Sequence, residues 1–261
     1  MISEIDLRAR NSALFNLSRL RVTIIGCGSI GSFTASTLTR MGVDRFNLFD
    51  GDSVGPENIG VQDFTIHQLD VPKVEAVKQN IMSINPLANV STVQDNITKE
   101  SSRLVAPIYG RVDSVEGVTD VVVMAVDSME ARMDIIQSKA FRSGYTRNDI
   151  RQDTNEFCSN SYFFDARMGS ETFQLYKFQI PFEIDNYLKT WYSDEDGDPE
   201  PCSARSTAYC STFAGSIIAS EIKKCTNGGM VAEKILFGFP SLLLNAEIDY
   251  PKFVENLKKT Q

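Results

Sequence analysis

The chain has 261 residues, of which 42% are hydrophobic, and this length and composition predict one large α/β domain with a substantial core. Its formal net charge of −8 at pH 7 argues against nucleic acid or an anionic membrane as the main partner. No apolar run of about 18 residues is present, so no membrane span is expected. The N-terminal stretch is charged and amphipathic and lacks the apolar segment of a secretory signal.

Alternating apolar strands and amphipathic helices are predicted for the first 140 residues. In chain order we expect a helix over 5–20, a strand over 21–26, a helix over 29–41 that ends at Gly42, a strand over 45–50, a helix that opens at Asp70 and closes at Asn85, strands over 89–94 and 120–126, and a helix over 129–142. The run DVVVMAV at 120–126 is typical of a central parallel strand that is buried on both faces.

The pattern changes after about residue 150. Two alternating strands are predicted over 160–168 and 171–180, followed by an acidic, turn-rich loop over 193–201. A helix rich in small residues over 206–224 and two short strands near 234–239 and 241–246 complete the chain. The fold class is therefore α/β, with a Rossmann-like, mixed and mostly parallel sheet that carries helices on both faces. We expect a single domain over 1–261.

Five cysteines occur without any C-x-x-C pair: Cys27, Cys158, Cys202, Cys210 and Cys225. An odd number without paired spacing argues against a disulfide framework and against a four-cysteine zinc site. We therefore expect a protein of the reducing cytoplasm with no structural zinc.

A glycine-rich motif, G-x-G-x-x-G, spans residues 26–31 between a predicted strand and a predicted helix. In this motif Gly26 permits the tight turn, Gly28 lets phosphate approach the backbone, and Gly31 lets the helix pack close to the strand. Ser29 and Ile30 begin the helix, whose free N–H groups attract an anion. The motif predicts a nucleotide site, and the alternative is a glycine turn without a ligand.

Asp50 ends the second predicted strand, 19 residues after Gly31. A carboxylate at this place can accept hydrogen bonds from both ribose hydroxyls. The spacing fits NAD and ATP equally well, so Asp50 alone does not choose between a dehydrogenase and an ATP-using enzyme. The alternative is an aspartate in a surface turn.

Three segments that follow the glycine motif favour ATP. DGDSVGPENIGVQ, DVPKVEAVKQNIMSINP and VVVMAVDSMEAR occur in this order along the chain. Together they resemble the ThiF/MoeB/E1-like superfamily of ubiquitin-like protein activators, with its D-x-D followed by an asparagine, its P-K before a helix, and its aspartate after the fourth strand. The resemblance covers about residues 8–135 and returns more loosely over 202–224.

The resemblance implies a site for ATP and Mg²⁺. It assigns the ribose to Asp50 and the phosphates to Asn58 and Lys73, and it makes Asp127 the Mg²⁺ ligand. Lys73 opens a helix, where the helix dipole disfavours a cation and a polyphosphate would relieve the conflict; the alternative is a solvated lysine. Asp127 has a helix N-cap as its alternative role. Asp52 and Gln62 complete the implied nucleotide-contacting set.

The sequence departs from the superfamily pattern at Val61, where the family motif has an arginine. The family also supplies an arginine from the N-terminal helix, here expected over 1–20, of the opposing subunit, and Arg10 is the nearest match. Family members that form a thioester or persulfide use a cysteine in a crossover segment, here residues 181–204. Cys202 matches that cysteine loosely, and Cys210 is the alternative that the following helix should bury.

The resemblance implies ATP-dependent adenylation of the C-terminal carboxylate of a small ubiquitin-like protein, performed by a homodimer. The acyl group would then leave AMP and pass to Cys202, to a conjugating enzyme or to a sulfur-carrier pathway. The main alternative is a catalytically silent binding subunit that supports an active partner, which Val61 motivates. Two further hypotheses are a tRNA-modifying dehydratase and an NAD(P)-dependent oxidoreductase. The net charge of −8 disfavours the dehydratase, because its substrate is a large RNA.

Overall fold

The computed structural model describes residue 7 and residues 12–98, 119–137, 162–179, 183–194 and 206–248. Over these residues the elements follow in the order β1 (Leu20–Ile25), α1 (Ser29–Arg40), β2 (Arg45–Phe49), η2 (Pro56–Asn58), η3 (Ile66–Gln68), α2 (Lys73–Ile84), β3 (Asn89–Val93), β4 (Thr119–Met124), α4 (Met129–Gln137), β5 (Tyr162–Met168), β6 (Thr172–Gln179), α6 (Ile184–Leu188), α7 (Ala208–Thr226), β7 (Lys234–Gly238) and β8 (Leu243–Glu247).

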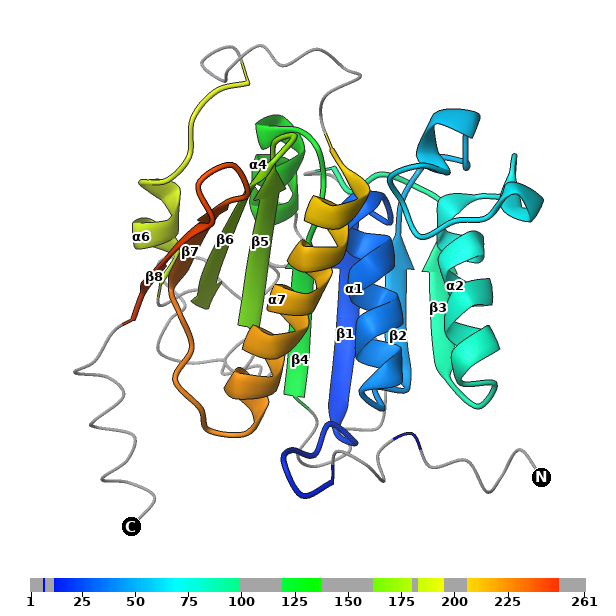
Figure 1. The fold of residues 1–261 in the computed structure, drawn as a ribbon, viewed down its shortest axis with the longest axis horizontal. Coiled ribbons are helices and arrows are strands. Elements are labelled where there is room, and N and C mark those ends of the chain that lie inside the picture. Colours follow the sequence, from blue (N-terminus) through cyan, green and yellow to red (C-terminus); the bar gives the residue numbers. More distant parts are fainter. Residues whose placement is uncertain are drawn as a thin grey trace, which may run out of the picture.

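The strands form one mixed sheet in the order β3-β2-β1-β4-β5-β6-β7-β8. The five strands from β3 to β5 pair in parallel, and β6, β7 and β8 continue the sheet with antiparallel pairs. The parallel half places the carboxyl ends of β1, β2 and β4 along one edge, at the top of Figure 1. Ligands of open α/β sheets bind at this edge.

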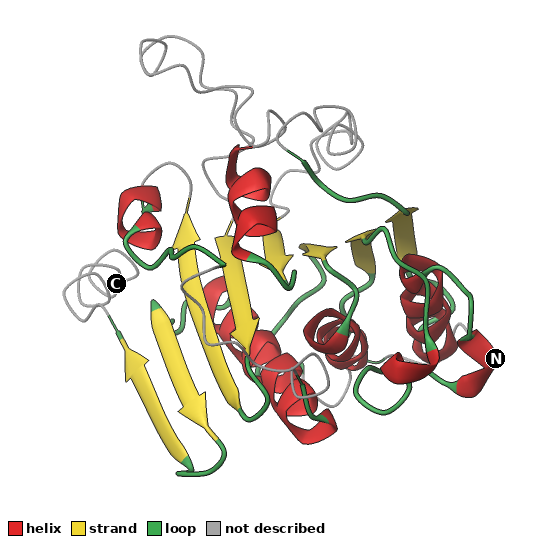
Figure 2. Cartoon of the chain, turned by 90° about the horizontal axis from the view of Figure 1, so that it is seen from above, coloured by secondary structure: helices red, strands yellow, loops and turns green. Residues whose placement is uncertain are grey.

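Helices cover both faces of the sheet (Figures 1 and 2). The cores on the two faces are separate. Val121 and Val123 of β4 join the cluster beneath α1, α2 and α7, whereas Val122 and Met124 join the cluster with α4 and α6. This alternation explains why β4 is apolar throughout, because both of its faces are buried.

Helix α7 packs closely against α1. A Cβ atom at Gly215 would lie 2.9 Å from the backbone carbon of Phe33, so only glycine allows this approach. The small residues of α7 therefore serve the packing that the sequence predicts, and they fix the position of α1 and of the loop before it.

The expected N-terminal helix is wrong over its described part, because residues 12–19 form turns and coil before β1 begins. Two side-chain contacts satisfy the backbone there instead: Asn16 Oδ1 accepts from Ser18 N, and Asn16 N donates to Asn227 Oδ1. Leu17 is buried in the core below α1. The remainder of the expected helix, apart from residue 7, lies outside the described residues.

Helix α2 begins at Lys73 rather than at Asp70. Asp70 adopts φ = +63°, which a right-handed helix does not allow. The chain then passes through an isolated bridge between Ser53 and Pro72 before the helix opens. The short helix α6 was not expected from the sequence. Within the described residues, no helix is long and apolar enough to cross a membrane.

Candidate nucleotide site

The glycine motif forms a tight loop between β1 and α1. Gly26 adopts φ = +91°, and a Cβ atom there would lie 2.5 Å from the carbonyl oxygen of Ala125. A Cβ atom at Gly31 would lie 2.0 Å from the carbonyl oxygen of Gly26. Both glycines are thus required by the protein itself, as the motif predicts.

Gly28 differs, because a Cβ atom there would meet nothing closer than the side-chain amide of Gln62, 3.8 Å away. The fold leaves room above this residue, which is the place where a phosphate would approach the backbone. The Oε1 atom of Gln62 is buried and has no hydrogen-bond partner in the described part of the chain. A carbonyl oxygen only accepts hydrogen bonds, so it would pair with a hydroxyl or N–H donor of a ligand and not with a phosphate oxygen.

The N-terminus of α1 is open to an acceptor. Among the described residues, the backbone N–H groups of Ser29, Ile30 and Gly31 donate to no protein oxygen, and the helix has no side-chain cap. Such orphan donors, together with the helix dipole, bind phosphate.

Helix α4 shows the opposite arrangement at its N-terminus. Met129 N and Glu130 N donate to the carboxylate of Asp194, at 2.7 and 3.1 Å, and Ala131 N donates to Ser128 Oγ at 3.1 Å. Its first donors are therefore already satisfied. Of α1 and α4, which follow the neighbouring strands β1 and β4, it is α1 whose first N–H groups are free among the described residues.

Asp50 lies at the end of β2, directly beside the glycine loop. Its Oδ2 atom accepts from Cys27 N at 2.7 Å, and its Oδ1 atom accepts from Asp52 N at 2.9 Å. A carboxylate has about four acceptor positions, so capacity remains for ribose hydroxyls. Burial raises the pKa of Asp50, while the two N–H bonds and the charge of Lys73 act in the opposite direction.

Lys73 is buried, with 8% of its surface exposed, so it is not a solvated surface lysine. Its ammonium group lies 2.7 Å from the carboxylate of Asp52, and its backbone N–H donates to Asp52 O. Asp52 therefore offsets the unfavourable helix dipole without any polyphosphate. The charge of Lys73 still reaches the loop, because it lowers the pKa of both Asp50 and Cys27 against the effect of burial.

The amides of the site lie at the end of η2 and in the turn that follows it. Asn58 is 9% exposed, and its Oδ1 atom accepts from Gly55 N at 2.8 Å, while its amide N–H₂ has no acceptor within the described ranges. Asp63 ties the segment to α1 through Ser32 and Ser36. The family arginine is replaced here by Val61, which lies between these two anchors.

Asp127 follows β4, two residues after the Ala125 carbonyl that contacts Gly26. Its side chain is exposed, and it has no hydrogen bond or ion pair with the described parts of the protein. Within those parts no three His, Cys, Asp or Glu side chains are grouped to hold a metal ion. One free carboxylate fits Mg²⁺, which proteins usually bind through one or two carboxylates together with substrate phosphates.

Arg132 does not take the place of the missing arginine. It is 4% exposed, and its guanidinium binds Asp165 Oδ1, Ser128 O and Ala166 O. Asp165 is fully buried and also pairs with Arg167 at 2.7 Å. Removing Asp165 would leave two buried guanidinium groups unpaired, at a cost on the order of 3–5 kcal/mol.

Three cysteines lie in the described residues, and each has a raised pKa. Burial raises the pKa of Cys27 well above its usual value, that of Cys210 to about 11 and that of Cys225 to about 12. All three are protonated thiols at neutral pH, so Cys210 lacks the thiolate that a nucleophile needs. Cys202 and Arg10 lie outside the described residues.

A contact at the start of α7 was not expected from the sequence. Ser206 is the first described residue after the segment that contains Cys202, and its hydroxyl accepts from Ser29 Oγ at 3.2 Å. The chain thus returns from the crossover segment to the N-terminus of α1, beside the glycine loop.

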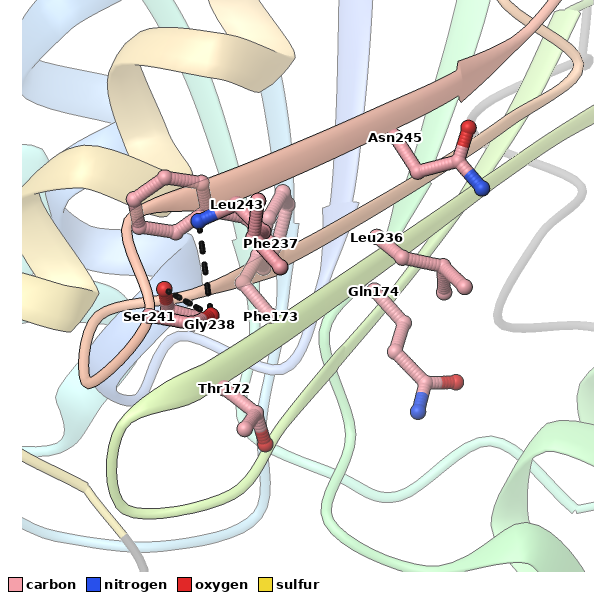
Figure 3. A pocket seen from close by; sticks show the side chains of 9 residues that line it. All are labelled: Thr172, Phe173, Gln174, Leu236, Phe237, Gly238, Ser241, Leu243 and Asn245. Carbon is pink, nitrogen blue, oxygen red and sulfur yellow. Dashed lines mark hydrogen bonds between the residues drawn. The ribbon is translucent and has the colours of Figure 1, made fainter.

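A shallow hollow of about 280 Å³ lies on the antiparallel half of the sheet, away from the glycine loop (Figure 3). Leu236, Leu243, Gln174 and Asn245 line it from β6, β7 and β8. The residues that line it include no titratable side chain, so we assign it no catalytic role.

The model of the ThiF family matches residues 7–233. The chain belongs to the ThiF family. Among its relatives, ubiquitin-like modifier-activating enzyme 5 of Bombyx mori is 32% identical over 136 residues, which are 49% of this chain and 35% of that protein. The same enzyme of Drosophila persimilis is 34% identical over 160 residues, or 57% of this chain and 42% of that protein. The chain thus matches less than half the length of these relatives.

Solved structures share the ThiF-family fold. The biosynthetic enzyme MccB in complex with N-formylated MccA is 14% identical with a TM-score of 0.65, and the match covers 95% of this chain and 73% of MccB. PaaA is 20% identical with a TM-score of 0.64, over 89% of this chain and 64% of PaaA. These likenesses support the Rossmann-like sheet described above.

Proposed function

We propose that this ThiF-family chain binds ATP on the glycine loop and adenylates the C-terminal carboxylate of a small ubiquitin-like protein. The observation that carries the proposal is the open N-terminus of α1, whose first N–H groups are free among the described residues and follow Gly28, where the fold leaves room for a ligand. The names of the relatives, ubiquitin-like modifier-activating enzyme 5, support the choice of substrate class.

The reaction is a displacement at the α-phosphorus. A carboxylate oxygen of the carrier forms a bond to the α-phosphorus, the bond to the bridging oxygen of the β-phosphate breaks, and pyrophosphate leaves with that electron pair. The carboxylate is already ionised at neutral pH, so the step needs no general base. Catalysis then consists of positioning the reactants and stabilising the developing charge.

The side chains around the loop divide this work. Asp50 would hold the ribose, the N–H groups at the start of α1 would hold phosphate oxygens, and the amide of Asn58 would donate to the triphosphate. Lys73 would exchange its exposed partner Asp52 for a phosphate, since Asp52 is 68% exposed and readily solvated. Mg²⁺ bound with ATP would supply further positive charge, with Asp127 as its protein ligand.

We further propose a homodimer in which Arg10 of one subunit completes the site of the other, because Val61 leaves the phosphate region short of a cation. Cys202 remains the proposed acceptor if the acyl group is passed on within the chain, and a conjugating enzyme or a sulfur-carrier pathway is the proposed destination otherwise. The compartment that we propose for this chemistry is the cytoplasm.

A second candidate function follows from Val61. Arg132 is held by Asp165 and so is not available to the phosphates, and a chain without an arginine at this place would be a silent subunit that supports an active partner. ATP binding separates the two functions, because a silent subunit has no need of saturable, Asp50-dependent affinity for ATP.

Exchange of labelled pyrophosphate into ATP tests the proposal. The assay contains the protein, ATP, Mg²⁺ and candidate ubiquitin-like proteins that end in a free glycine carboxylate. The matched control is the same carrier with a C-terminal amide, which has no oxygen to attack phosphorus. Exchange with the free carboxylate alone is the expected result. Equal exchange with both forms, or none with any carrier, contradicts the proposal.

A further inference from the structure

The segment Glu183–Asp194, called the crossover strap below, is tied to the sheet through the buried charge cluster around Asp165. Tyr187 Oη donates to Asp165 Oδ2 at 2.9 Å, and burial together with that carboxylate raises the pKa of Tyr187, so the phenol remains a donor. Arg167, which pairs with Asp165, donates to Thr190 O at 2.9 Å and to Thr190 Oγ1 at 3.2 Å. The cluster therefore fixes the backbone of the strap at two points.

The end of the strap is bound to α4. The two carboxylate oxygens of Asp194 accept from Met129 N and Glu130 N, and the indole N–H of Trp191 donates to Met129 O at 3.3 Å. These residues lie more than sixty positions apart in the sequence. A carboxylate at this position also complements the positive end of the helix dipole.

This cap lies next to Asp127. Two residues before it, Ala125 donates its N–H to Ile25 O at 2.8 Å and its carbonyl lies against Gly26 of the glycine loop. Two residues after it, Met129 donates its N–H to Asp194. The turn that presents Asp127 is thus fixed on one side by the glycine loop and on the other by the strap.

We propose that Asp194 is a positioning residue for the proposed adenylation site: by capping α4 from the crossover strap, it fixes the turn that presents Asp127 to the Mg²⁺–ATP complex. The inference rests on the proposed function. It assigns Asp165 the role of the anchor that holds the strap in place.

The test uses Asp194→Ala, with Asp194→Asn as an intermediate variant, because the amide keeps one of the two acceptor oxygens and replaces the other with a donor. The matched control is Asp185→Ala, which removes an exposed carboxylate from the same strap, where it forms no hydrogen bond or ion pair with the described residues. Trp191 is the single tryptophan of the chain, so its emission reports the strap directly.

Two measurements on the whole protein are read together. In the free protein, Asp194→Ala should shift the emission of Trp191 to longer wavelength and increase its quenching by acrylamide, whereas Asp185→Ala should leave both unchanged. In calorimetric titrations, Asp194→Ala should lower the affinity for ATP in the presence of Mg²⁺ by about tenfold and leave the Mg²⁺-free affinity within about twofold. Asp194→Asn should fall between the wild-type protein and Asp194→Ala in both measurements.

The outcomes separate the inference from the function on which it rests. A change in Trp191 without a loss of Mg²⁺-dependent affinity, or a loss of that affinity with Trp191 unchanged, overturns the positioning role. Equal behaviour of Asp194→Ala and Asp185→Ala in both measurements also overturns it. If the wild-type protein binds no ATP, the proposed function fails and the positioning role fails with it, while the Trp191 comparison still decides whether Asp194 docks the strap.

Discussion

At the scale of single residues, the site contains side chains whose role in the fold conflicts with their proposed role in binding. Asp50 is the clearest case, because it is a half-buried carboxylate that organises the glycine loop. Burial raises its pKa, so ionisation carries a cost in the folded protein that the unfolded chain does not have. A carboxylate at this place that binds ribose therefore lowers the stability of the folded protein.

Asp50→Asn tests this conflict through its pH dependence. The folded pKa lies above the unfolded value, so the wild-type protein loses stability as pH rises from below that value through the folded pKa. The melting temperature of Asp50→Asn, relative to wild type, should accordingly rise between about pH 4 and pH 7. Affinity for ATP should fall by about tenfold or more with the loss of a charged hydrogen-bond acceptor. A relative melting temperature that falls with pH contradicts the assignment.

Val61 decides whether the site is complete as it stands. If a partner subunit already supplies the cation, Val61→Arg adds like-charge repulsion and should lower the exchange rate about fivefold, the effect of about 1 kcal/mol. Val61→Leu is the uncharged control and should remain close to wild type. An increase in rate with Val61→Arg would instead indicate that the chain has lost a catalytic arginine at this position.

At the scale of elements, two glycines of the glycine loop serve different purposes. Gly31 is required for the packing of α1, whereas Gly28 is proposed to be required for binding ATP. Gly31→Ala places a Cβ atom 2.0 Å from the Gly26 carbonyl, so α1 must move and the fold should lose about 1–3 kcal/mol. Gly28→Ala meets nothing closer than 3.8 Å, so its stability should change little while its affinity for ATP falls. Thermal melting and ATP titration of both variants check this contrast. A stable Gly28→Ala that binds ATP normally would show that no phosphate approaches this residue.

Much of the element order follows from local pattern alone. The apolar run of β4, the glycines at 26 and 31, and Gly42 after α1 each have a direct local cause, and the structure confirms them. The expected helix over 5–20 is wrong over residues 12–19, because Asn16 bonds to Ser18 and Asn227 while Leu17 enters the core. A contact between positions 16 and 227 leaves no signal in an amphipathic pattern.

The part of the site that sequence reasoning missed is the set of long-range polar contacts. Asp52 neutralises Lys73 through the fold of the loop between them, and Asp194 caps a helix that begins 65 residues earlier. One signal was present: Asp165 and Arg167 stand two positions apart inside the apolar strand YFFDARM, and so on the same face. Charges at such positions predict a buried, paired network.

At the scale of the whole molecule, the proposal requires two subunits to build each site. Mixing Arg10→Ala with Asp127→Asn tests it, since a mixed dimer carries one site with both wild-type residues. Random exchange of subunits should restore about a quarter of wild-type pyrophosphate exchange from two variants that are each inactive. An inactive mixture, with mixed dimers shown to be present, means that Arg10 does not act across a subunit interface.

The central claim is that the AMP part of ATP is transferred to a carrier carboxylate at the glycine loop. Its most direct measurement follows label from ATP to a ubiquitin-like carrier with a free C-terminal glycine, using ATP labelled either at the α-phosphorus or at the γ-phosphorus. We predict that the α-label becomes bound to the carrier and the γ-label leaves as pyrophosphate, and that Asp127→Asn lowers the transfer by about a hundredfold or more. Carrier labelled from the γ-phosphorus, or α-label transfer that is unchanged in Asp127→Asn, would contradict the account.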